Sequence, residues 1–401
     1  MTDTAAAGND VAPRRRRPKN RKAQILSAAA EAFSERGYHA VGVDDIAAVV
    51  GISGPALYRH FPTKYALFTH AVMRLADTLM AATDPALTTE SDPESTLDAV
   101  VLAIIRTTID NRRTGGLYRW EGRYLIGDDK IALRDAVFEL GERVRRPLHR
   151  LRPELSEADT AMLSTAAISV IASITAHRSA LSAKQIEALM SSAAWSILRA
   201  DLPPDSPTTA VTEAPRRAPV SKREVLLHQA IALFYARGYH EVSIEEIGAA
   251  AGINASSVYR HFPSKAELLA AAFQRANERL TVALGDALAE SESSVQAIEA
   301  LARLYTELSF ERSELLAVYF AEIGNVPADQ RTTLRNVQRL NVEEWAHLVR
   351  EARPELTGVG ARFLVHAALG LVFDVGRVVR FDRSPSTIRR VQHLMTTVLL
   401  G

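Results

Sequence analysis

Two short segments of the chain carry the same set of side chains that can bind phosphate. Residues 58–64 and 259–265 both read Tyr-Arg-His-Phe-Pro-x-Lys. Tyrosine, histidine and lysine can donate hydrogen bonds to phosphate oxygens, and arginine can reach a phosphate or a base edge. The candidate contacts are Tyr58, Arg59, His60 and Lys64 in the first segment and Tyr259, Arg260, His261 and Lys265 in the second. The pattern therefore indicates contact with nucleic acid at two places.

These segments belong to a longer repeat with an offset of 201 positions. Residues 37–68 align with residues 238–269 without a gap, and 15 of the 32 pairs are identical. The same offset pairs Tyr118 with Tyr319, far outside the shared motif. Because the repeat extends over half of the 401 residues, the chain is expected to consist of two similar subunits joined in one.

Each repeated segment contains the pattern of a helix-turn-helix. In the first copy, apolar residues at helical spacing predict helices over residues 25–36, 43–50 and about 54–60. Ser53 and Asn254 are N-cap candidates for the third helix of each copy. A fourth helix is expected to begin after Thr63 and to run to about Met80. Such a unit places its last short helix in the major groove of DNA.

Base reading is expected from the first residues of the third helix. These are Ser53, Gly54, Pro55 and Ala56 in the first copy and Asn254, Ala255, Ser256 and Ser257 in the second. The Gly-Pro-Ala sequence offers no side-chain hydrogen bond, whereas the two serines offer hydroxyl groups. The two copies are therefore expected to read different half-sites of an asymmetric DNA site.

A basic cluster precedes each copy, although the formal net charge of the chain is only +1. The first cluster lies within residues 14–22, and the second lies within residues 216–223. Either run alone is explained by a solvated tail, but their matched positions favour contact with phosphates. The candidate contacts are Arg16, Arg17, Arg21, Lys222 and Arg223.

Together these motifs resemble the DNA-binding domain of the tetracycline-repressor (TetR) family over about 50 residues per half. The resemblance rests on Phe-x-x-x-Gly-Tyr, Gly-Ile-(Ser/Asn) and Tyr-Arg-His-Phe-Pro-x-Lys-x-x-Leu, which occur twice in this order. It implies an all-α fold of two tandem units, each with a helix-turn-helix domain and a helical ligand-binding and dimerisation domain, arranged as an intramolecular pseudo-dimer. It also implies a transcriptional regulator, most simply a repressor released by a small apolar effector, with no cofactor. Tandem regulators of this kind in actinobacteria suggest a lipid- or sterol-related effector.

Composition places the expected domain boundaries. The expected segments are a basic arm over 1–20, a first DNA-binding domain over 21–69, a helical domain over 70–200, a linker over 201–220, a second DNA-binding domain over 221–270 and a second helical domain over 271–401. The linker holds five prolines, and extended chain of about 20 residues reaches on the order of 60 Å at about 3.1 Å per residue. The second half can therefore reach the first.

Residues 160–176 form an uncharged run whose apolar side chains share one helical face. Its serines and threonines favour a buried interface helix over a membrane span. In the family, the last two helices of each subunit form a four-helix dimer interface. The matching stretches are 157–180, 184–198, 359–379 and 385–399. A monomer whose halves pack on each other is expected, with a homodimer as the alternative.

The effector, by resemblance, binds between these helices and the rest of each domain. The aromatic and histidine candidates are Tyr118, Trp120, Tyr124 and His177 in the first half and Tyr305, Tyr319, Trp345 and His366 in the second. Each of these residue types is also common in cores, so the assignment is open.

Other classes of function find little in the sequence. There is no cysteine, phosphate-binding loop, dinucleotide fingerprint or His-Glu-x-x-His motif, so an enzyme is not expected. The pair Asp128 and Asp129 is explained by a helix start. The N-terminus has no apolar stretch after its charges, which argues against a signal peptide and for a cytoplasmic protein. An activator and a non-repressing interaction scaffold remain alternatives.

Overall fold

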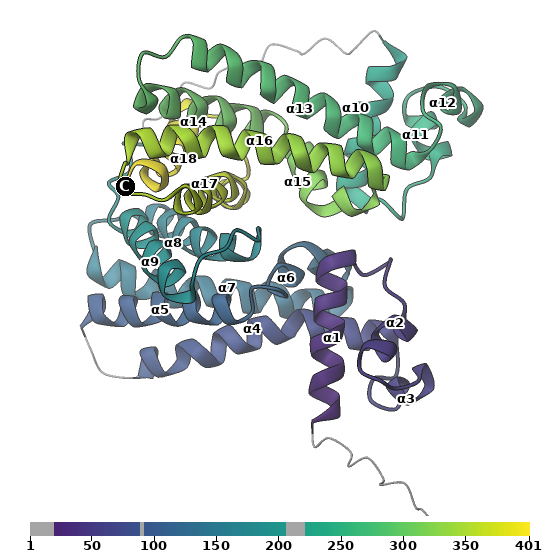
Figure 1. Cartoon of the computed structure of the whole chain (residues 1–401), viewed down its shortest axis with the longest axis horizontal. Coiled ribbons are helices and arrows are strands. Elements are labelled where there is room, and N and C mark those ends of the chain that lie inside the picture. Colours follow the sequence, from purple (N-terminus) through teal and green to yellow (C-terminus); the bar gives the residue numbers. More distant parts are fainter. Residues whose placement is uncertain (1–19, 89–91, 206–220) are drawn as a thin grey trace, which may run out of the picture. The chain divides into compact units, whose positions relative to one another are not determined.

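The computed structural model describes residues 20–88, 92–205 and 221–401. Within these ranges the chain is helical and contains no β-strand, which confirms the all-α fold. The helices of the first half are α1 (Arg21–Arg36), α2 (Val43–Val49), α3 (Gly54–Tyr58), α4 (Lys64–Thr88), α5 (Pro93–Asp110), α6 (Gly116–Trp120), the 3₁₀ helix η1 (Glu121–Tyr124), α7 (Gly127–Leu151), α8 (Glu157–Ala172), η2 (Ser173–Thr175) and α9 (Ala183–Leu198). Those of the second half are α10 (Lys222–Arg237), α11 (Ile244–Ala250), α12 (Ala255–His261), α13 (Lys265–Ala289), α14 (Ser294–Glu311), α15 (Ser313–Glu322), η3 (Ile323–Asn325), α16 (Ala328–Ala352), α17 (Gly358–Val378) and α18 (Pro385–Leu400) (Figure 1).

The helices repeat with the offset that the sequence indicates. Helices α4 and α13, and likewise α7 and α16, begin and end 201 residues apart. The last helices, α9 and α18, are displaced by 202 residues, so the second half carries one more residue before its final helix. The duplication therefore includes the helical domains as well as the DNA-binding motifs.

The chain divides into two compact units, and the division falls after Ala71. The first unit contains the first helix-turn-helix, α1 to α3, together with the start of α4. The second unit contains everything from Val72 onward, including the second helix-turn-helix. That second motif shares a core with the helical domain, because Val318 and Leu334 are buried together with its own apolar side chains. The domain bounds that the sequence predicts for this motif, 221–270, stay a prediction.

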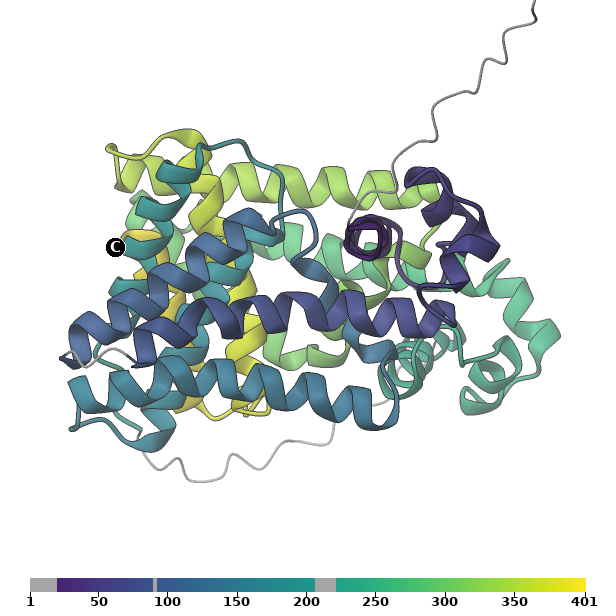
Figure 2. The same cartoon turned by 90° about the horizontal axis from the view of Figure 1, so that it is seen from below.

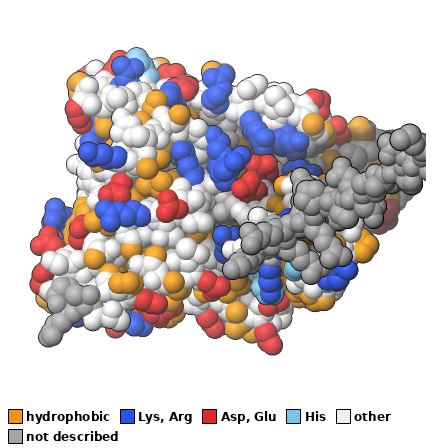
Figure 3. Space-filling view, turned by 60° about the horizontal axis from the view of Figure 1, so that its bottom comes forward, with side chains coloured by type: hydrophobic (Ala, Val, Ile, Leu, Met, Phe, Trp, Pro, Cys, Tyr) orange, Lys and Arg blue, Asp and Glu red, His pale blue; other side chains and the backbone are white. Residues whose placement is uncertain are grey.

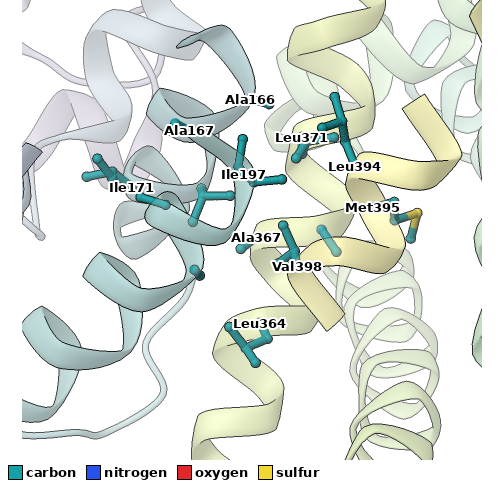
Figure 4. Close-up of a cluster of buried hydrophobic side chains, with 14 of the residues drawn as sticks. Ala166, Ala167, Ile171, Ile197, Leu364, Ala367, Leu371, Leu394, Met395 and Val398 are labelled. Carbon is teal, nitrogen blue, oxygen red and sulfur yellow. The ribbon is translucent and has the colours of Figure 1, made fainter. Parts of the chain in front are cut away.

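The two halves meet at a seam formed by α8 and α9 on one side and α17 and α18 on the other (Figure 4). From the first half the seam buries Ala166, Ala167, Ile171 and Ile197, and from the second half it buries Leu364, Ala367, Leu371, Leu394, Met395 and Val398. Burying such side chains stabilises a fold by about 25 cal/mol per Å² of apolar surface. The expected four-helix interface thus forms within one chain.

Ion pairs also cross this seam. Arg119 of α6 pairs with Asp374 of α17, and Ser169 of α8 donates a hydrogen bond to the same carboxylate. Arg390 of α18 pairs with Asp159 of α8. Buried pairs of this kind contribute little net stability, but breaking one leaves an uncompensated charge. They therefore favour one register of the two halves over others.

Two seam segments, residues 157–175 and α17, are apolar and long enough by composition to cross a membrane. In each, 61% of the most apolar window is buried inside the protein. The apolar character of both segments is explained by burial at the seam.

Outside the seam, α5 lies beside α7, and their counterparts α14 and α16 lie side by side in the same way (Figures 1 and 2).

Two helix ends differ from the sequence expectation. Helix α3 ends at Tyr58 rather than near His60, whereas its counterpart α12 does reach His261. Helix α4 continues to Thr88, past the expected end near Met80 and through Pro85. Its extra turns are held by tertiary contacts, because Thr83 is fully buried and Arg143 of α7 donates to the Met80 carbonyl. Such contacts stabilise helix beyond its local propensity.

Candidate DNA-binding heads and effector cavity

We call residues 20–71 the first head and residues 221–272 the second head. The apolar side chains of each repeated motif form the core of its head. All are at most 2% exposed: Phe33, Ile46, Leu57 and Phe61 in the first head and Phe234, Ile247, Val258 and Phe262 in the second. Because these residues point inward, the polar residues between them must face outward. The motif is thus split into a packing side and a solvent side.

The turn before the third helix depends on a glycine in each head. Gly51 has φ +69° and Gly252 has φ +68°, a left-handed conformation that other residues adopt only with strain. The chain then closes back on the second helix, through Ile52 N–H to the Ala47 carbonyl at 3.0 Å and Ile253 N–H to the Gly248 carbonyl at 2.9 Å. This tight turn fixes the direction in which α3 and α12 leave.

The sequence-predicted base readers and their neighbours lie largely on the solvent side. Tyr58 is 47% exposed and Tyr259 is 51% exposed. Also exposed are Ser53, Pro55, Arg59 and His60 in the first head and Asn254, Ser256, Arg260 and His261 in the second, while Ala56, Ala255 and Ser257 are half-buried. Gly54 is buried, and a Cβ there would lie 2.2 Å from Oδ1 of Asp44. Contact of these residues with DNA stays a prediction.

The two heads differ at the start of the third helix. The Asn254 side chain caps α12 by accepting hydrogen bonds from Ser257 N–H and Ser256 Oγ, both at 2.9 Å. Ser53, at the matching position, makes no side-chain cap. Arg260 donates to Ser257 Oγ at 2.6 Å. The second head therefore presents an ordered polar cluster where the first presents Pro55 and the half-buried Ala56.

The two candidate lysines contact the heads themselves. Lys64 Nζ lies 4.5 Å from the ring centre of Tyr38, and Lys265 Nζ lies 4.3 Å from that of Tyr239. Lys265 also donates to the carbonyls of Tyr239 and Val242, both at 2.7 Å. Burial lowers the pKa of both lysines from its ordinary value. With three ammonium protons, Lys265 keeps one for a phosphate.

The described members of the basic clusters also connect parts of each head. Arg21 donates to the Val50 carbonyl at 2.8 Å, and Lys222 donates to the matching Ala251 carbonyl at 3.5 Å. The residue after each of these places its cationic group over a buried phenylalanine ring, Lys22 over Phe61 and Arg223 over Phe262. Arg16 and Arg17 lie outside the described residues. On the face drawn in Figure 3, Lys and Arg side chains lie in separate groups among acidic and uncharged side chains.

A cavity of about 550 Å³ lies in the second half, among α10, α13, α14, α15 and α16. Its apolar wall includes Phe273, Tyr305, Tyr319, Phe320 and Trp345, together with Leu369 of α17. Its polar groups include Asn277, Gln338 and Asn341, and Tyr319 donates to Gln338 Oε1 at 3.1 Å. Burial raises the pKa of Tyr319 to about 12, and it also raises the pKa of Tyr305. Both phenols are neutral near pH 7, as tyrosine ordinarily is, and the raised pKa extends this to more alkaline pH.

The rim of this cavity is charged. Arg275 pairs with Glu224 at 3.4 Å, and Arg312 pairs with Glu311 at 3.6 Å. Arg279, Arg383 and Glu314 also line the cavity. An aromatic interior with a charged rim suits a ligand with a largely apolar body and a polar end.

Three of the sequence-predicted ligand residues, Tyr305, Tyr319 and Trp345, line this cavity. His177 and His366 do not; they stack on each other across the seam with ring centres 4.3 Å apart. Tyr118 packs against the seam core, and Tyr124 lies beside Arg123 and Glu322. The side chain of Trp120 lies outside what the structure describes. A ligand role for these five residues stays a prediction.

Sequence reasoning missed the amide residues of the cavity. Gln338, Asn341 and Trp345 lie three and four residues apart on α16, so they share one helical face. Two amide side chains on the otherwise apolar face of a helix could have indicated a ligand-binding cavity from the sequence alone. Phe273 and Phe320 carried no such signal, because an isolated phenylalanine is most often a core residue.

A second hollow, an open groove of about 990 Å³, lies between α5 and α9 in the first half. The indole of Trp195 donates to Asp98 at 2.9 Å, and Arg199 stacks on Trp195 while pairing with Glu94 at 2.8 Å. Its main polar side chains thus bind one another. Among the described residues, no cluster of three or more histidine or acidic side chains could hold a metal ion.

Comparison with known proteins agrees with this geometry. Residues 25–71 and 226–272 match the model of the bacterial regulatory proteins of the tetR family. The chain is 37% identical over 128 residues to the HTH-type transcriptional activator FasR of Mycolicibacterium smegmatis, which covers 30% of this chain and 58% of that relative. It is 30% identical over 139 residues to the nucleoid occlusion factor SlmA of Vibrio atlanticus, covering 34% of this chain and 69% of that relative.

Matches among solved structures cover less than half of this chain and nearly all of the matched chain. One is the ketosteroid transcriptional regulator KstR2 of Mycobacterium tuberculosis, with 21% identity, a TM-score of 0.40, and coverage of 46% of this chain and 95% of that one. Another is the TetR family regulator PfmR of Thermus thermophilus, with 25% identity, a TM-score of 0.39, and coverage of 44% of this chain and 94% of that one. The chain belongs to the TetR family of bacterial regulatory proteins and carries the family's DNA-binding domain twice.

Proposed function

We propose that one chain of this TetR-family DNA-binding regulator occupies one operator as a monomer, in the place of a dimer. The observation that carries the proposal is the seam, in which α8 and α9 of one half bury their apolar faces against α17 and α18 of the other. In a homodimer of single-copy subunits, such faces would have to be covered by a second chain. Here the chain covers them itself, which supports a monomer, and we expect a DNA-binding regulator of this kind to be cytoplasmic.

The operator of such a chain is asymmetric. Two identical subunits must read inverted repeats, whereas these two heads present different residues to the bases. The first head offers Pro55 and Ala56 beside the buried Gly54, and the second offers hydroxyls from Ser256 and Ser257 on a capped helix. The half-site of the first head is therefore read chiefly through shape and apolar contact, and that of the second head chiefly through hydrogen bonds.

Operator binding is released by an effector that binds the cavity of the second half, so the chain acts as a repressor. The aromatic wall formed by Tyr305, Tyr319 and Trp345 supports a small and largely apolar effector, in keeping with a lipid- or sterol-related compound. The charged rim provides for a polar end. One effector per chain is the stoichiometry that this cavity supports.

Activation is the second candidate, because the FasR relative is named as an activator. The interaction scaffold, the third candidate, predicts no preference for any DNA sequence. Transcription from the chain's own upstream promoter, measured in vitro with and without the protein, separates the first two. A repressor lowers the transcript level, and an activator raises it.

Footprinting on the upstream DNA, with native mass spectrometry of the complex, tests the proposal. Arg59→Ala and Arg260→Ala each remove an exposed arginine from one head. Each is expected to weaken protection of one half-site only, by about 1–3 kcal/mol if the arginine reads a base. Arg134→Ala on α7, where Arg134 is 73% exposed, is the matched control and is expected to change neither half-site. Two equivalent inverted half-sites, or two chains per operator, would contradict the proposal.

A further inference from the structure

A buried carboxylate lies where α15, the second head and the first half come together. Glu322, the last residue of α15, is 1% exposed. Its Oε1 accepts a hydrogen bond from Tyr239 N–H at 3.1 Å, and its Oε2 accepts one from Asn325 Nδ2 at 2.7 Å. A buried carboxylate that loses a donor carries the full cost of its desolvation, so these contacts are held strongly.

The first half supplies further donors to the same carboxylate. Arg123 Nη2 lies 3.3 Å from Glu322 Oε2, and the hydroxyl of Tyr124 lies 3.4 Å from it. Arg123 also donates to the Ala321 carbonyl and, at 2.7 Å, to the hydroxyl of Tyr124. Both residues belong to η1. The offset of 201 pairs Arg123 with Gly324, so the second half has no arginine with which to return the contact.

Tyr239 forms part of the turn that joins α10 to α11 in the second head. Glu322 holds its N–H, while Lys265 Nζ holds its carbonyl and that of Val242. The turn is therefore fixed from two sides, by α15 and by the start of α13. Helices α11 and α12, which carry the predicted base-reading residues, follow directly from this turn.

The same helix, α15, also forms part of the cavity wall along its length. Leu315, Tyr319 and Phe320 line it, and Phe320 precedes Glu322 by only two residues. The ring of Tyr319 also packs edge-on against Phe273 of α13. A ligand in the cavity must contact or displace these rings. Because α15 is a single ten-residue helix, a displacement of its wall residues also moves Glu322.

We propose that Glu322 transmits occupancy of the cavity to the second head, and that Arg123 makes the first half part of the same switch. The inference rests on the effector cavity proposed above. A shift of α15 either pulls the Tyr239 turn with Glu322 or breaks their hydrogen bond. In both cases α12 changes its orientation, and the second head responds to the effector directly. Arg123 resists this shift, because its guanidinium holds both the carboxylate and the end of α15.

Hydrogen–deuterium exchange with an apolar probe tests the coupling. The probe is 8-anilinonaphthalene-1-sulfonate, whose aromatic body and anionic group match the cavity wall and its rim. In the wild-type chain, the probe is expected to slow exchange in peptides of residues 313–322 and to change exchange in residues 238–243 by at least threefold. In Glu322→Gln, the first effect is expected to persist and the second to disappear.

Matched controls come from an exposed ion pair of the first half. Arg106 and Glu187 lie 2.9 Å apart, and Arg106 is 61% exposed. Glu187→Gln and Arg106→Met are expected to behave as the wild type. If Glu322→Gln does not fold, Arg123→Met provides the test, since it is expected to speed exchange of residues 238–243 even without the probe. A response of residues 238–243 to the probe that is equal in the wild type and in Glu322→Gln would overturn the proposal, as would unchanged exchange in Arg123→Met.

Failure of the coupling and failure of the proposed function give different results. A probe that protects residues 313–322 of the wild type but leaves residues 238–243 unchanged refutes the coupling and leaves the cavity in place. A probe that protects neither segment refutes the cavity, and Arg123→Met then decides whether the contact exists. Wild-type protein without sequence preference refutes the proposed regulator, whatever the exchange results.

Discussion

Truncating one seam residue is expected to destabilise both halves of the chain together. Leu371 of α17 is fully buried, and it faces the small and branched side chains of the seam (Figure 4). Leu371→Ala removes buried methyl groups and leaves a cavity, which costs about 2–5 kcal/mol. The unfolding entropy is about 2.1 cal/mol/K per residue, and we take residues 72–401 to unfold as one unit. Each kcal/mol lost from the free energy of unfolding then lowers Tm by about 1.4 °C. The expected fall in Tm is therefore about 3–7 °C.

The assay follows each half through its own tryptophan. Trp195 lies on α9 of the first half, and Trp345 lies on α16 of the second. Variants that retain one of these two tryptophans, with the others replaced by phenylalanine, report thermal unfolding by fluorescence. Leu371→Ala lies in the second half, yet the shared seam predicts that the midpoint reported by Trp195 falls as far as that reported by Trp345.

The matched control is Leu340→Ala, because Leu340 is 59% exposed on α16. Truncation there is expected to change Tm by less than about 1 °C, since exposed substitutions usually change stability within about 0.5 kcal/mol. A fall in the Trp345 midpoint alone would show that the halves unfold separately. That result, or a fall no larger than the control's, would refute the reasoning.

Three further changes test other parts of the account. Deleting residues 1–19 should reduce the slope of log binding constant against log salt concentration by roughly 3 to 4 units, if this basic arm makes about four phosphate contacts. An unchanged slope would show that the arm does not contact DNA. Burial, with Arg362 nearby, lowers the pKa of His366 from 6.5 to about 4. Between these two pH values the unfolded chain binds a proton that the folded chain excludes. The free energy of unfolding should therefore fall as the pH drops from about 6.5 to about 4. His366→Gln should flatten that dependence of Tm on pH, and a slope equal to the wild type's would contradict burial of the neutral ring. A Cβ on Gly376 would lie 2.4 Å from Phe381 Cε1, so Gly376→Ala should lower stability by about 1–3 kcal/mol. The control Gly285→Ala should not, because no atom lies within 4 Å of the Cβ that it adds. Equal Tm values for the two variants would refute the clash.

Local signals were sufficient to predict the helix-turn-helix motifs. The positive φ of Gly51 and Gly252, the Asn254 cap and the Thr63 cap at 2.9 Å from Ala66 N–H all depend on residues close together in sequence. Ser53 has the right residue type but makes no cap, so type and position alone were not enough there. A buried interface helix over residues 160–176 was predictable as well, because a helix that is apolar over a wide face must be covered. Its packing against residues 359–379 and 385–399 was predicted from the family resemblance.

Features that depend on distant residues were not predictable. Glu322 lies 83 positions from Tyr239 and 199 from Arg123, and no pattern in one sequence pairs them. The stacking of His177 on His366 across the seam was hidden for the same reason, since the offset of 201 does not pair these two residues. The continuation of α4 past Met80 required the contact of Arg143 from α7. Tertiary contacts decide these features, and local propensity does not.

One chain, with its two unlike heads, is proposed to occupy one operator. Native mass spectrometry of the purified protein with its own upstream DNA, together with affinities across a salt series, tests this most directly. We expect a complex of one chain per duplex, with tight binding that weakens steeply as salt rises. Two chains per duplex, or no preference over random DNA of the same length, would contradict it.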